Sequence, residues 1–415
     1  MKNYYDYIII GTGLSGLYSA YLIKKKDPSR TILILDKEKK EWIGGRTGNE
    51  EFYNTQVVTG AGVGRKNKDT LLFKLLKELD ITHMKEEVVQ MNYAKTIKHP
   101  VNVLKIINGL KKHYNKLRVK PNVTFKEFAQ PILGDELYKS FTICSGYTDY
   151  ENEDVYEVLY NYGFSDNYPG WTAVMVPWKK LVQKLIGLIG NNNVKSLHKV
   201  IKIKNMSNSN GNRNRNGTLY ECFCETIQGI KSYFANKVII ATTINSVLKL
   251  LPNYSIYTQI KGQPFLRVYG KFTKKSANIL KHFVPYQTIV PGPLHSIIPI
   301  KNEVYMIAYT DNYGATALKD YIKNTAANRK LFVDLLERSL GIEHCTLDLI
   351  AIKGFYWPIG THYYEPLHDY PNRKSFLQVA QNPAKGLFVV GEMVSLDQGW
   401  TEGALESVHA VLNEF

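Results

Sequence analysis

Three glycines near the start of the chain have the spacing of a phosphate-binding turn. Gly11, Gly13 and Gly16 fill the pattern G-x-G-x-x-G, between the β-branched run 7–10 and an apolar helical pattern. In such a turn the first glycine allows a tight bend, the second lets a phosphate approach the backbone, and the third lets the helix pack on the strand. The N–H groups and the dipole of the helix N-terminus favour the same anion. These residues therefore predict a dinucleotide pyrophosphate site.

An acidic residue follows a second predicted strand, residues 31–35. Asp36 lies twenty residues after Gly16, and a carboxylate at that place can accept hydrogen bonds from ribose hydroxyls. Because strand, turn, helix, strand and acid fall in this order, we favour a real nucleotide site over a chance glycine cluster. NAD and FAD both remain open at this point.

Three further segments bear on the choice of dinucleotide. In residues 42–47 (WIGGRT) paired glycines precede Arg46. Its guanidinium can donate paired hydrogen bonds to a pyrophosphate. Residues 238–243 form a buried strand pattern that ends in small residues. The strand pattern 386–392 ends in an acid, and a helix begins just beyond Trp400. A helix N-terminus that faces a flavin pyrimidine would stabilise the negative charge of the reduced ring.

Together these segments resemble the flavin-containing amine oxidase family, which includes monoamine, polyamine and L-amino acid oxidases. The resemblance is strong at the two ends of the chain and covers the middle only by the order of elements. It implies an α/β fold with an α+β second domain: a Rossmann-like FAD-binding domain interrupted by a mixed sheet and helical substrate domain, in a p-hydroxybenzoate-hydroxylase-like two-domain architecture. It implies FAD, bound noncovalently because Thr361 stands where monoamine oxidases carry a flavin-linked cysteine.

The resemblance also implies which residues hold FAD. In the family the glycine turn and Arg46 contact the phosphates, residues 60–63 run beside the isoalloxazine, Val200 contacts adenine, and Glu392 reaches the ribityl or pyrophosphate region. The full cofactor-binding set is Gly11, Gly13, Leu14, Ser15, Gly16, Asp36, Lys37, Gly44, Gly45, Arg46, Gly60, Ala61, Gly62, Val63, Val200, Thr242, Gly391, Glu392, Trp400, Thr401 and Ala404.

Two aromatic positions are candidates for a cage in front of the flavin. Trp400 stands where relatives place one wall, and its electron-rich face suits an amine or ammonium. The alternative is a core tryptophan at the start of a helix. The opposite wall is expected from residues 357–363, filled by His362 or Tyr363. For His362 a structural histidine in a loop is an equal alternative.

Two arginines bear on the substrate. In the strand 265–272, side-chain alternation puts Arg267 and Tyr269 on one face. Arg267 takes the place of a lysine that relatives often bond to a water. Arginine cannot act as a base, although it could hold a water or bind a substrate carboxylate. Arg65 could grip a carboxylate bidentately, as an arginine near this strand does in amino acid oxidases. We favour a surface role for Arg65, because a charge run follows it.

Patterns along the rest of the chain predict the second domain. Residues 70–188 are mostly helical by pattern, and a helix is predicted at 327–340. Further strands are predicted at 237–242, 265–272, 288–290, 295–300 and 304–309. A hairpin is predicted from 200–203 and 219–224, with its tip at 207–217. The domains are expected at 1–75, 190–250 and 375–415 for FAD, and at 76–189 and 251–374 for the substrate.

Composition narrows the remaining classes of function. Four cysteines in 415 residues do not make a disulfide framework, which favours a soluble protein of the cytoplasm. No stretch is long and apolar enough for a membrane span, and no metal site is predicted. The formal net charge of +16 is interpreted as solvated lysines rather than nucleic-acid binding, because no compact basic and aromatic motif accompanies it.

The resemblance implies an FAD-dependent oxidase that takes a hydride equivalent from the C–H next to an amine, in an amine or an L-amino acid. The products would be an imine and, with molecular oxygen, hydrogen peroxide. The expected partners are the small-molecule substrate and oxygen, with a homodimer as the one protein assembly considered. Two alternatives stay open: an FAD-dependent C–C desaturase or dehydrogenase of the same fold, and an FAD-binding structural protein that has lost turnover.

Overall fold

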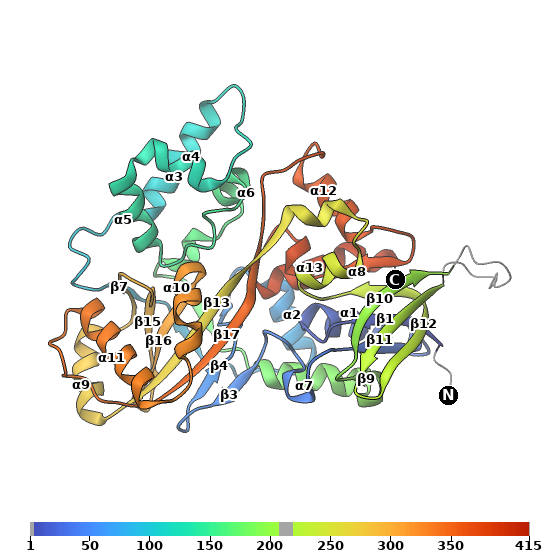
Figure 1. Cartoon of the computed structure of the whole chain (residues 1–415), viewed down its shortest axis with the longest axis horizontal. Helices are drawn as coiled ribbons and strands as arrows, with labels where there is room; N and C mark the ends of the chain where they lie inside the picture. The colour runs from blue at the N-terminus through green and yellow to red at the C-terminus, as the bar shows by residue number, and fades with distance from the viewer. Residues whose placement is uncertain (1–3, 207–218, 415) are drawn as a thin grey trace.

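The computed structural model describes residues 4–206 and 219–414, so the predicted hairpin tip at 207–217 lies outside the described residues. Two large sheets with their covering helices form two domains, and a group of helices extends from the second (Figure 1). Within the described part of the chain, no helix has both the length and the apolar character that crossing a membrane requires.

The first sheet is parallel at its centre and carries an antiparallel hairpin at one side. The order is β10-β11-β12-β1-β2-β9, and β18 pairs in parallel with the end of β12. The strands are β1 (Tyr4–Ile10), β2 (Ile32–Leu35), β9 (Val194–Lys195), β10 (Lys199–Asn205), β11 (Tyr220–Thr226), β12 (Gly229–Ile240) and β18 (Leu387–Val389). The hairpin prediction is confirmed by β10 and β11. A strand from the end of the chain therefore completes the sheet that β1 begins.

Helices cover both faces of this sheet, which is why β1 and β2 are apolar on both sides. One face carries α1 (Leu14–Lys26), α2 (Thr70–Glu78), α7 (Trp178–Ile189) and α13 (Thr401–Val411). The other carries α8 (Ile244–Leu250) and α12 (Arg373–Gln381). We expected residues 178–189 in the substrate domain. Instead, Leu181 and Leu185 of α7 are buried in the same core as α1, so this helix packs with the first domain.

The second sheet has the order β17-β13-β16-β15-β14-β7. Its strands are β7 (Met91–Tyr93), β13 (Ile260–Phe272), β14 (Gln287–Ile289), β15 (Ser296–Lys301), β16 (Val304–Asp311) and β17 (Leu349–Tyr364). One face packs on α9 (Lys274–Phe283), α10 (Asn312–Leu318) and α11 (Ala326–Leu340). Leu266 and Val268 of β13 belong to that core, whereas Arg267 and Tyr269 point away from it, as the alternation predicted.

Strand β17 was not predicted. Residues 357–363, where we expected the opposite wall of the cage or, as an equal alternative for His362, a loop histidine, lie inside this strand of 16 residues. Gly354, Pro358 and Gly360 interrupt the strand pattern in the sequence. The structure accommodates Pro358 because β17 is the edge strand of its sheet, where a missing N–H donor costs no ladder bond.

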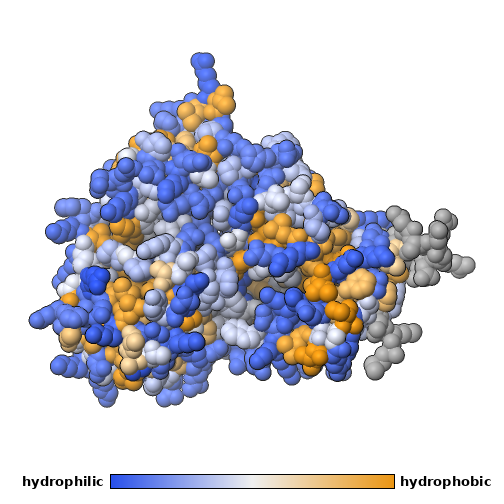
Figure 2. Space-filling model, viewed as in Figure 1, coloured by the Kyte–Doolittle hydropathy of each residue, from blue (hydrophilic) through white to orange (hydrophobic). Residues whose placement is uncertain are grey.

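The insert between the domains is largely helical, as predicted. It contains α3 (Val103–Lys116), α4 (Phe125–Leu133), α5 (Asp135–Ser145) and α6 (Val155–Tyr160), which share one apolar core. Thr124 and Glu127 form a capping box at the start of α4. Several short strands were not predicted. They are β7 and β9, given above, and β3 (Asn49–Glu51), β4 (Gln56–Val58), β5 (Gly64–Arg65), β6 (Glu86–Val88) and β8 (Thr172–Val174). Hydrophilic side chains cover most of the helical group at the top of Figure 2.

Candidate functional site

The glycine turn between β1 and α1 forms an open cradle. A Cβ on Gly11, whose φ is +108°, would lie 2.3 Å from the carbonyl oxygen of Ala241, and a Cβ on Gly16 would lie 2.2 Å from the Gly11 oxygen. Only glycine fits these two positions. Gly13 differs, because a Cβ there would meet nothing within 4 Å. The first turn of α1 has no side-chain cap at Gly13, so its N–H groups face this open space and could bind phosphate.

Asp36 braces the same turn. Its Oδ2 accepts hydrogen bonds from the backbone N–H of Thr12, at 2.7 Å, and from the Thr12 hydroxyl. Its Oδ1 accepts from the N–H of Glu38 at 2.8 Å. Asp36 thus stands at the end of β2, as predicted, but part of its acceptor capacity is used to hold the turn. Lys37 beside it is exposed and pairs with Glu38 at 3.5 Å.

The second glycine pair packs directly on this turn. The N–H of Gly44 donates to the carbonyl of Thr12 at 3.0 Å, and Gly13 bridges to Gly44 in parallel. The N–H of Ala61 donates to the Arg46 carbonyl at 2.7 Å, which ties residues 60–63 to the same place. The predicted cofactor segments therefore meet at the carboxyl ends of β1 and β12, where open α/β sheets bind ligands.

A buried chain of polar groups joins three distant segments of the protein. The Arg46 guanidinium donates to the carbonyl of Gly360 at 2.7 Å and to Oε1 of Glu392 at 2.9 Å. Glu392 also contacts Nδ1 of His362 and accepts from the N–H of Gly399 at 3.0 Å. Burial alone would raise the pKa of Glu392, but His362 and Arg46 hold that pKa well below its ordinary value.

His362 is committed to this chain rather than free for catalysis. Its Nε2 accepts the N–H of Ile244 at 3.1 Å, so Nδ1 carries the proton that is donated to Glu392. The ring is 3% exposed, although an edge of the residue reaches the cavity described next. The loop alternative is wrong, because His362 lies in β17 and is buried.

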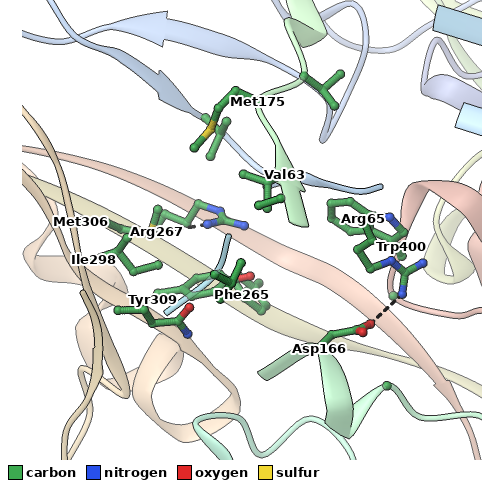
Figure 3. A pocket seen from close by; sticks show the side chains of 18 of the residues that line it. Val63, Arg65, Asp166, Met175, Phe265, Arg267, Ile298, Met306, Tyr309 and Trp400 are labelled. Carbon is green, nitrogen blue, oxygen red and sulfur yellow. Dashed lines mark hydrogen bonds and ion pairs between the residues drawn. The ribbon is translucent and has the colours of Figure 1, made fainter. Parts of the chain in front are cut away.

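One large cavity lies between the two sheets, with a volume of about 1260 Å³. Residues from both domains and from the insert line it, among them Gly62, Val63, Arg65, Phe265, Arg267, Met306, Tyr309, Thr361, His362 and Trp400. Figure 3 shows Arg267, Tyr309 and Phe265 gathered on one side of it and Trp400 with Arg65 on the other. Tyr363, the other candidate for the second wall, is not among the described residues that line the cavity.

Arg267 is a buried cation without an acidic partner among the described residues. It is 4% exposed, and its Nε donates to the carbonyl of Gly60 at 2.7 Å. Its guanidinium lies 4.1 Å from the centre of the Tyr309 ring, which supplies a cation–π contact. Tyr309 and Phe265 were missed by the sequence analysis. Phe265 shares the face of Arg267 by alternation along β13, whereas only the pairing of β13 with β16 brings Tyr309 beside Arg267.

Arg65 lies at the cavity wall within a cluster of carboxylates. Its side chain is 14% exposed and binds three carboxylates: Asp69 at 2.7 Å, Asp166 at 2.8 Å and Asp397 at 2.9 Å. Burial would lower the pKa of Arg65, but these carboxylates raise it above its ordinary value. The surface role is therefore wrong, and a substrate carboxylate would have to displace a paired aspartate.

Trp400 is fixed by the same cluster. Its Nε1 donates to Oδ2 of Asp69 at 2.9 Å, and the Arg65 guanidinium lies 5.6 Å from its ring centre. Trp178 packs edge-on against it, with ring centres 6.3 Å apart. Trp400 is partly exposed to the cavity at the start of α13. Trp400 thus lies on one wall of the cavity, and its contacts with Asp69, Arg65 and Trp178 fix the orientation of its ring.

Comparisons with known proteins agree with this architecture. A family model described as an NAD(P)-binding Rossmann-like domain matches residues 9–79. An uncharacterised protein of Acanthamoeba polyphaga mimivirus is 21% identical, over 99% of this chain and 93% of that protein. A flavin-containing amine oxidase of Oncorhynchus mykiss is 32% identical, but over only 24% of this chain and 19% of its own length.

Two solved structures match over almost the whole chain. Cyclohexylamine oxidase from Brevibacterium oxydans aligns with a TM-score of 0.72 at 14% identity, covering 99% of both chains. Wild-type putrescine oxidase bound to putrescine aligns with a TM-score of 0.71 at 12% identity, covering 99% of this chain and 98% of that one. The chain has the fold of the flavin-containing amine oxidases. The family resemblance and the two-domain α/β fold class predicted from the sequence are confirmed.

Within this amine oxidase fold, two buried hydroxyls lack a partner among the described residues, at the place where the predicted cofactor-binding residues meet the cavity. Oγ1 of Thr361 and Oγ1 of Thr401 make no hydrogen bond in the described part of the chain. Thr361 lines the cavity, and Thr401 begins α13. Because buried hydroxyls are normally satisfied, these atoms fit a ligand with acceptors at this place.

The remaining predicted cofactor residues lie around this region at different depths. Leu14 and Ala404 are buried in α1 and α13. Thr242 follows β12, and its methyl group faces Gly11. Gly391 follows β18 beside the hydroxyl of Ser15. Val200 is in β10, partly buried and farther from the turn in the strand order.

An acidic group on the cavity wall was missed by the sequence analysis. Asp149 and Glu153 line the cavity and belong to the run DYENED at 149–154, which is the signal that could have found them. Burial, and the nearby charge of Asp311, raise the pKa of Asp149. Burial likewise raises the pKa of Glu153. The cavity therefore has carboxyl groups at one place and the Arg267 guanidinium at another.

Proposed function

We propose that this protein binds FAD noncovalently and oxidises an amine at the carbon next to nitrogen, with molecular oxygen as the acceptor. The observation that carries the proposal is one cavity shared by Trp400, by residues 62–63 and by the buried Arg267. The match to cyclohexylamine oxidase and putrescine oxidase structures supports it. The four unpaired cysteines support a reducing compartment such as the cytoplasm.

The residues present fit FAD. The uncapped start of α1 and the space beside Gly13 would take the pyrophosphate, and the hydroxyls of Thr361 and Thr401 would find partners on the flavin side. Threonine at position 361 offers no thiol for a flavin linkage, which supports noncovalent binding. When bound, the flavin would accept the hydride equivalent from the substrate and pass electrons to oxygen.

The protein's contribution would be to bind, orient and desolvate the amine. Trp400 and the Tyr309 and Phe265 rings present aromatic surface to the cavity, which suits an amine approaching as a cation. Burial then favours the neutral amine, because low dielectric disfavours the charged form. Arg267 would not act as the base, since guanidinium stays protonated.

The Arg267 guanidinium favours a substrate that also bears a carboxylate. A buried cation without an acidic partner is costly, and a carboxylate ligand would form charge-assisted hydrogen bonds with it. Arg65 cannot offer the same contact while three aspartates occupy it. Among amines, an L-amino acid is thus the class that Arg267 supports.

The test is anaerobic mixing of the purified protein with a panel of amines and L-amino acids while flavin absorbance is followed. We expect a yellow protein whose absorbance bleaches with a substrate and returns on admission of oxygen, with release of peroxide. Trp400→Ala should slow bleaching by about 10-fold or more, because it removes a cation–π contact and the aromatic surface that orients the amine. Flavin content should persist. A yellow protein that no member of the panel bleaches would contradict the proposal.

A second variant separates amino acids from simple amines. Arg267→Met keeps similar length without charge, and we expect it to raise KM for amino acids by about 10-fold or more, the loss expected for one charged hydrogen bond. KM for amines that lack a carboxylate should change little. Equal effects on both classes would remove the carboxylate role from Arg267.

A further inference from the structure

Glu153 is a buried carboxylate that faces the cavity without a partner. It lies between α5 and α6 and is 7% exposed. Within residues 4–206 and 219–414, its side chain makes neither a hydrogen bond nor an ion pair, although its backbone bonds to Tyr150 and Phe125. Glu153 is one of the residues that line the cavity. A buried polar group without a partner calls for a ligand to explain it.

Asp149 adds a second acid to the same wall. Its Oδ1 accepts the hydroxyl hydrogen bond of Tyr162, and no lysine or arginine pairs with it in the described part of the chain. Behind it, Asp311 accepts from the N–H groups of Thr148 and Asp149, at 2.9 and 3.1 Å. Glu153 and Asp149 thus form a local excess of acid, which we call the acidic wall.

Other carboxylates around the cavity are already neutralised. Asp166 and Asp397 bind Arg65, and Glu87 binds Lys85 at 3.0 Å. The acidic wall is therefore distinct from these pairs, because its two carboxyl groups remain available to a cation from outside the protein.

The acidic wall is separated from Arg267 along strand β13. The side-chain amide of Gln263 donates to the backbone carbonyl of Asp149 at 2.6 Å. Gln263 and Arg267 are four residues apart on the strand, or about 13 Å at the usual rise. Tyr147 lines the cavity between the two charges and interacts electrostatically with both. A substrate that reaches from Arg267 to the acidic wall therefore needs several carbon–carbon bonds between its two ends.

We propose that Glu153 and Asp149 form a subsite for a second cationic group, an ammonium or guanidinium at the far end of the substrate from the amine that is oxidised. This inference rests on the proposed function and narrows its substrate class to diamines and basic amino acids. The second group stays charged in the subsite, whereas the reacting amine must lose its proton, so the two ends of the substrate are distinguished.

The subsite would select its ligand by pairing a buried carboxylate with a substrate cation. Burial, together with the charges of Glu157 and Asp149, raises the pKa of the Glu153 carboxyl even though the charge of Arg373 lowers it, so the empty subsite favours the neutral acid. A substrate cation there would favour the carboxylate and gain charge-assisted hydrogen bonds. An apolar substrate end would leave Glu153 unpaired and Asp149 with the Tyr162 hydroxyl alone, and this mismatch is what gives selectivity.

The test uses two matched pairs of ligands with the flavin-bound protein. Cadaverine and pentylamine differ only in the far ammonium, and so do L-lysine and L-norleucine. Binding is measured by calorimetry without oxygen on protein whose flavin has already been reduced, so that no substrate is consumed, and turnover is measured separately by peroxide release. We expect the member of each pair with the far ammonium to bind at least tenfold more tightly.

Glu153→Gln is the main variant, with Asp149→Asn as a second and Glu87→Gln as the matched control. Glu153→Gln and Asp149→Asn should each lower the affinity ratio within a pair by about tenfold, the usual effect of losing one charged hydrogen bond. Glu87→Gln should leave the ratio unchanged, because Glu87 is exposed and already paired with Lys85. Flavin content and thermal unfolding confirm that each variant folds.

The outcomes separate this inference from the proposed function. Ratios near one in the unaltered protein, or ratios unaffected by both acidic-wall variants, would overturn the subsite even if amines are oxidised. Binding that depends on Glu153 without any turnover would support the subsite and contradict the oxidase function.

Discussion

At the scale of single residues, charge partners decide the roles of the two arginines. Arg65 and Arg267 both line the cavity and both are largely buried. Arg65 is surrounded by three aspartates, whereas Arg267 has aromatic rings and backbone oxygen. Arg65 consequently helps to hold Trp400 in place, whereas Arg267 is free to bind a ligand.

Replacing Arg65 tests its structural role. Arg65→Gln leaves Asp69, which is fully buried, without its cation, so the free energy of unfolding should fall by about 3–5 kcal/mol. Trp400 fluorescence should shift, because Asp69 and Arg65 hold its ring. Chemical denaturation and emission spectra measure both. Lys66→Gln is the control, since that exposed pair with Glu86 is worth at most about 1 kcal/mol. Equal losses in the two variants would disprove the structural role.

At the scale of elements, the glycines of the β1–α1 turn have two different roles: two are needed for folding, and the third leaves space for a cofactor. Gly11 and Gly16 are required by contacts with the protein's own backbone. A Cβ on Gly13 would meet nothing within 4 Å among the described residues, and Gly13 has an ordinary φ of −63°. The fold does not require glycine at this position, and we propose that the space beside it takes the pyrophosphate.

Gly13→Ala should consequently fold normally and bind FAD poorly. Its methyl group would project toward the pyrophosphate, and we expect flavin occupancy to fall at least 10-fold, since a loss of about 1.4 kcal/mol already gives that factor. Thermal unfolding of the flavin-free protein should stay unchanged. Gly109→Ala in α3, where a Cβ is also unhindered, should keep full occupancy and gain up to about 1 kcal/mol in stability. Normal flavin occupancy in Gly13→Ala would place the pyrophosphate elsewhere.

At the scale of the whole molecule, the insert and the second sheet enclose acids whose ionisation opposes folding. Burial, and the charge of Asp311, raise the pKa of Asp149 to about 7, above its unfolded value of about 4. Between these values the folded protein holds more protons than the unfolded chain. Stability therefore decreases as pH rises through this window.

Asp149→Asn removes this titration. Compared with the unaltered protein, the variant should gain stability on the order of 2 kcal/mol as the pH rises from about 4 to about 8. Tyr162 can still donate to the asparagine oxygen, so its hydrogen bond survives. Urea denaturation of both proteins across this pH range measures the difference. A difference that does not depend on pH would show that Asp149 is ionised normally in the folded state.

The sequence by itself determined the features that depend on neighbours along the chain. The glycine turn, the hairpin β10–β11, the alternation around Arg267 and the strand β18 near the C-terminus all follow from local periodicity and turn chemistry. Strand β17 was not found, because its proline and glycines hide the pattern and only its edge position permits them.

The tertiary structure alone decided which groups meet. Arg65 and Asp397 are 332 residues apart, and Arg46 and Glu392 are 346 apart. No local pattern encodes such a pair. A side chain's charge, tautomer and freedom to bind depend on what folding places within a few ångströms of it. For that reason the sequence indicated the cofactor region, whereas only the folded chain showed Arg65 paired, His362 committed and Glu153 unpartnered.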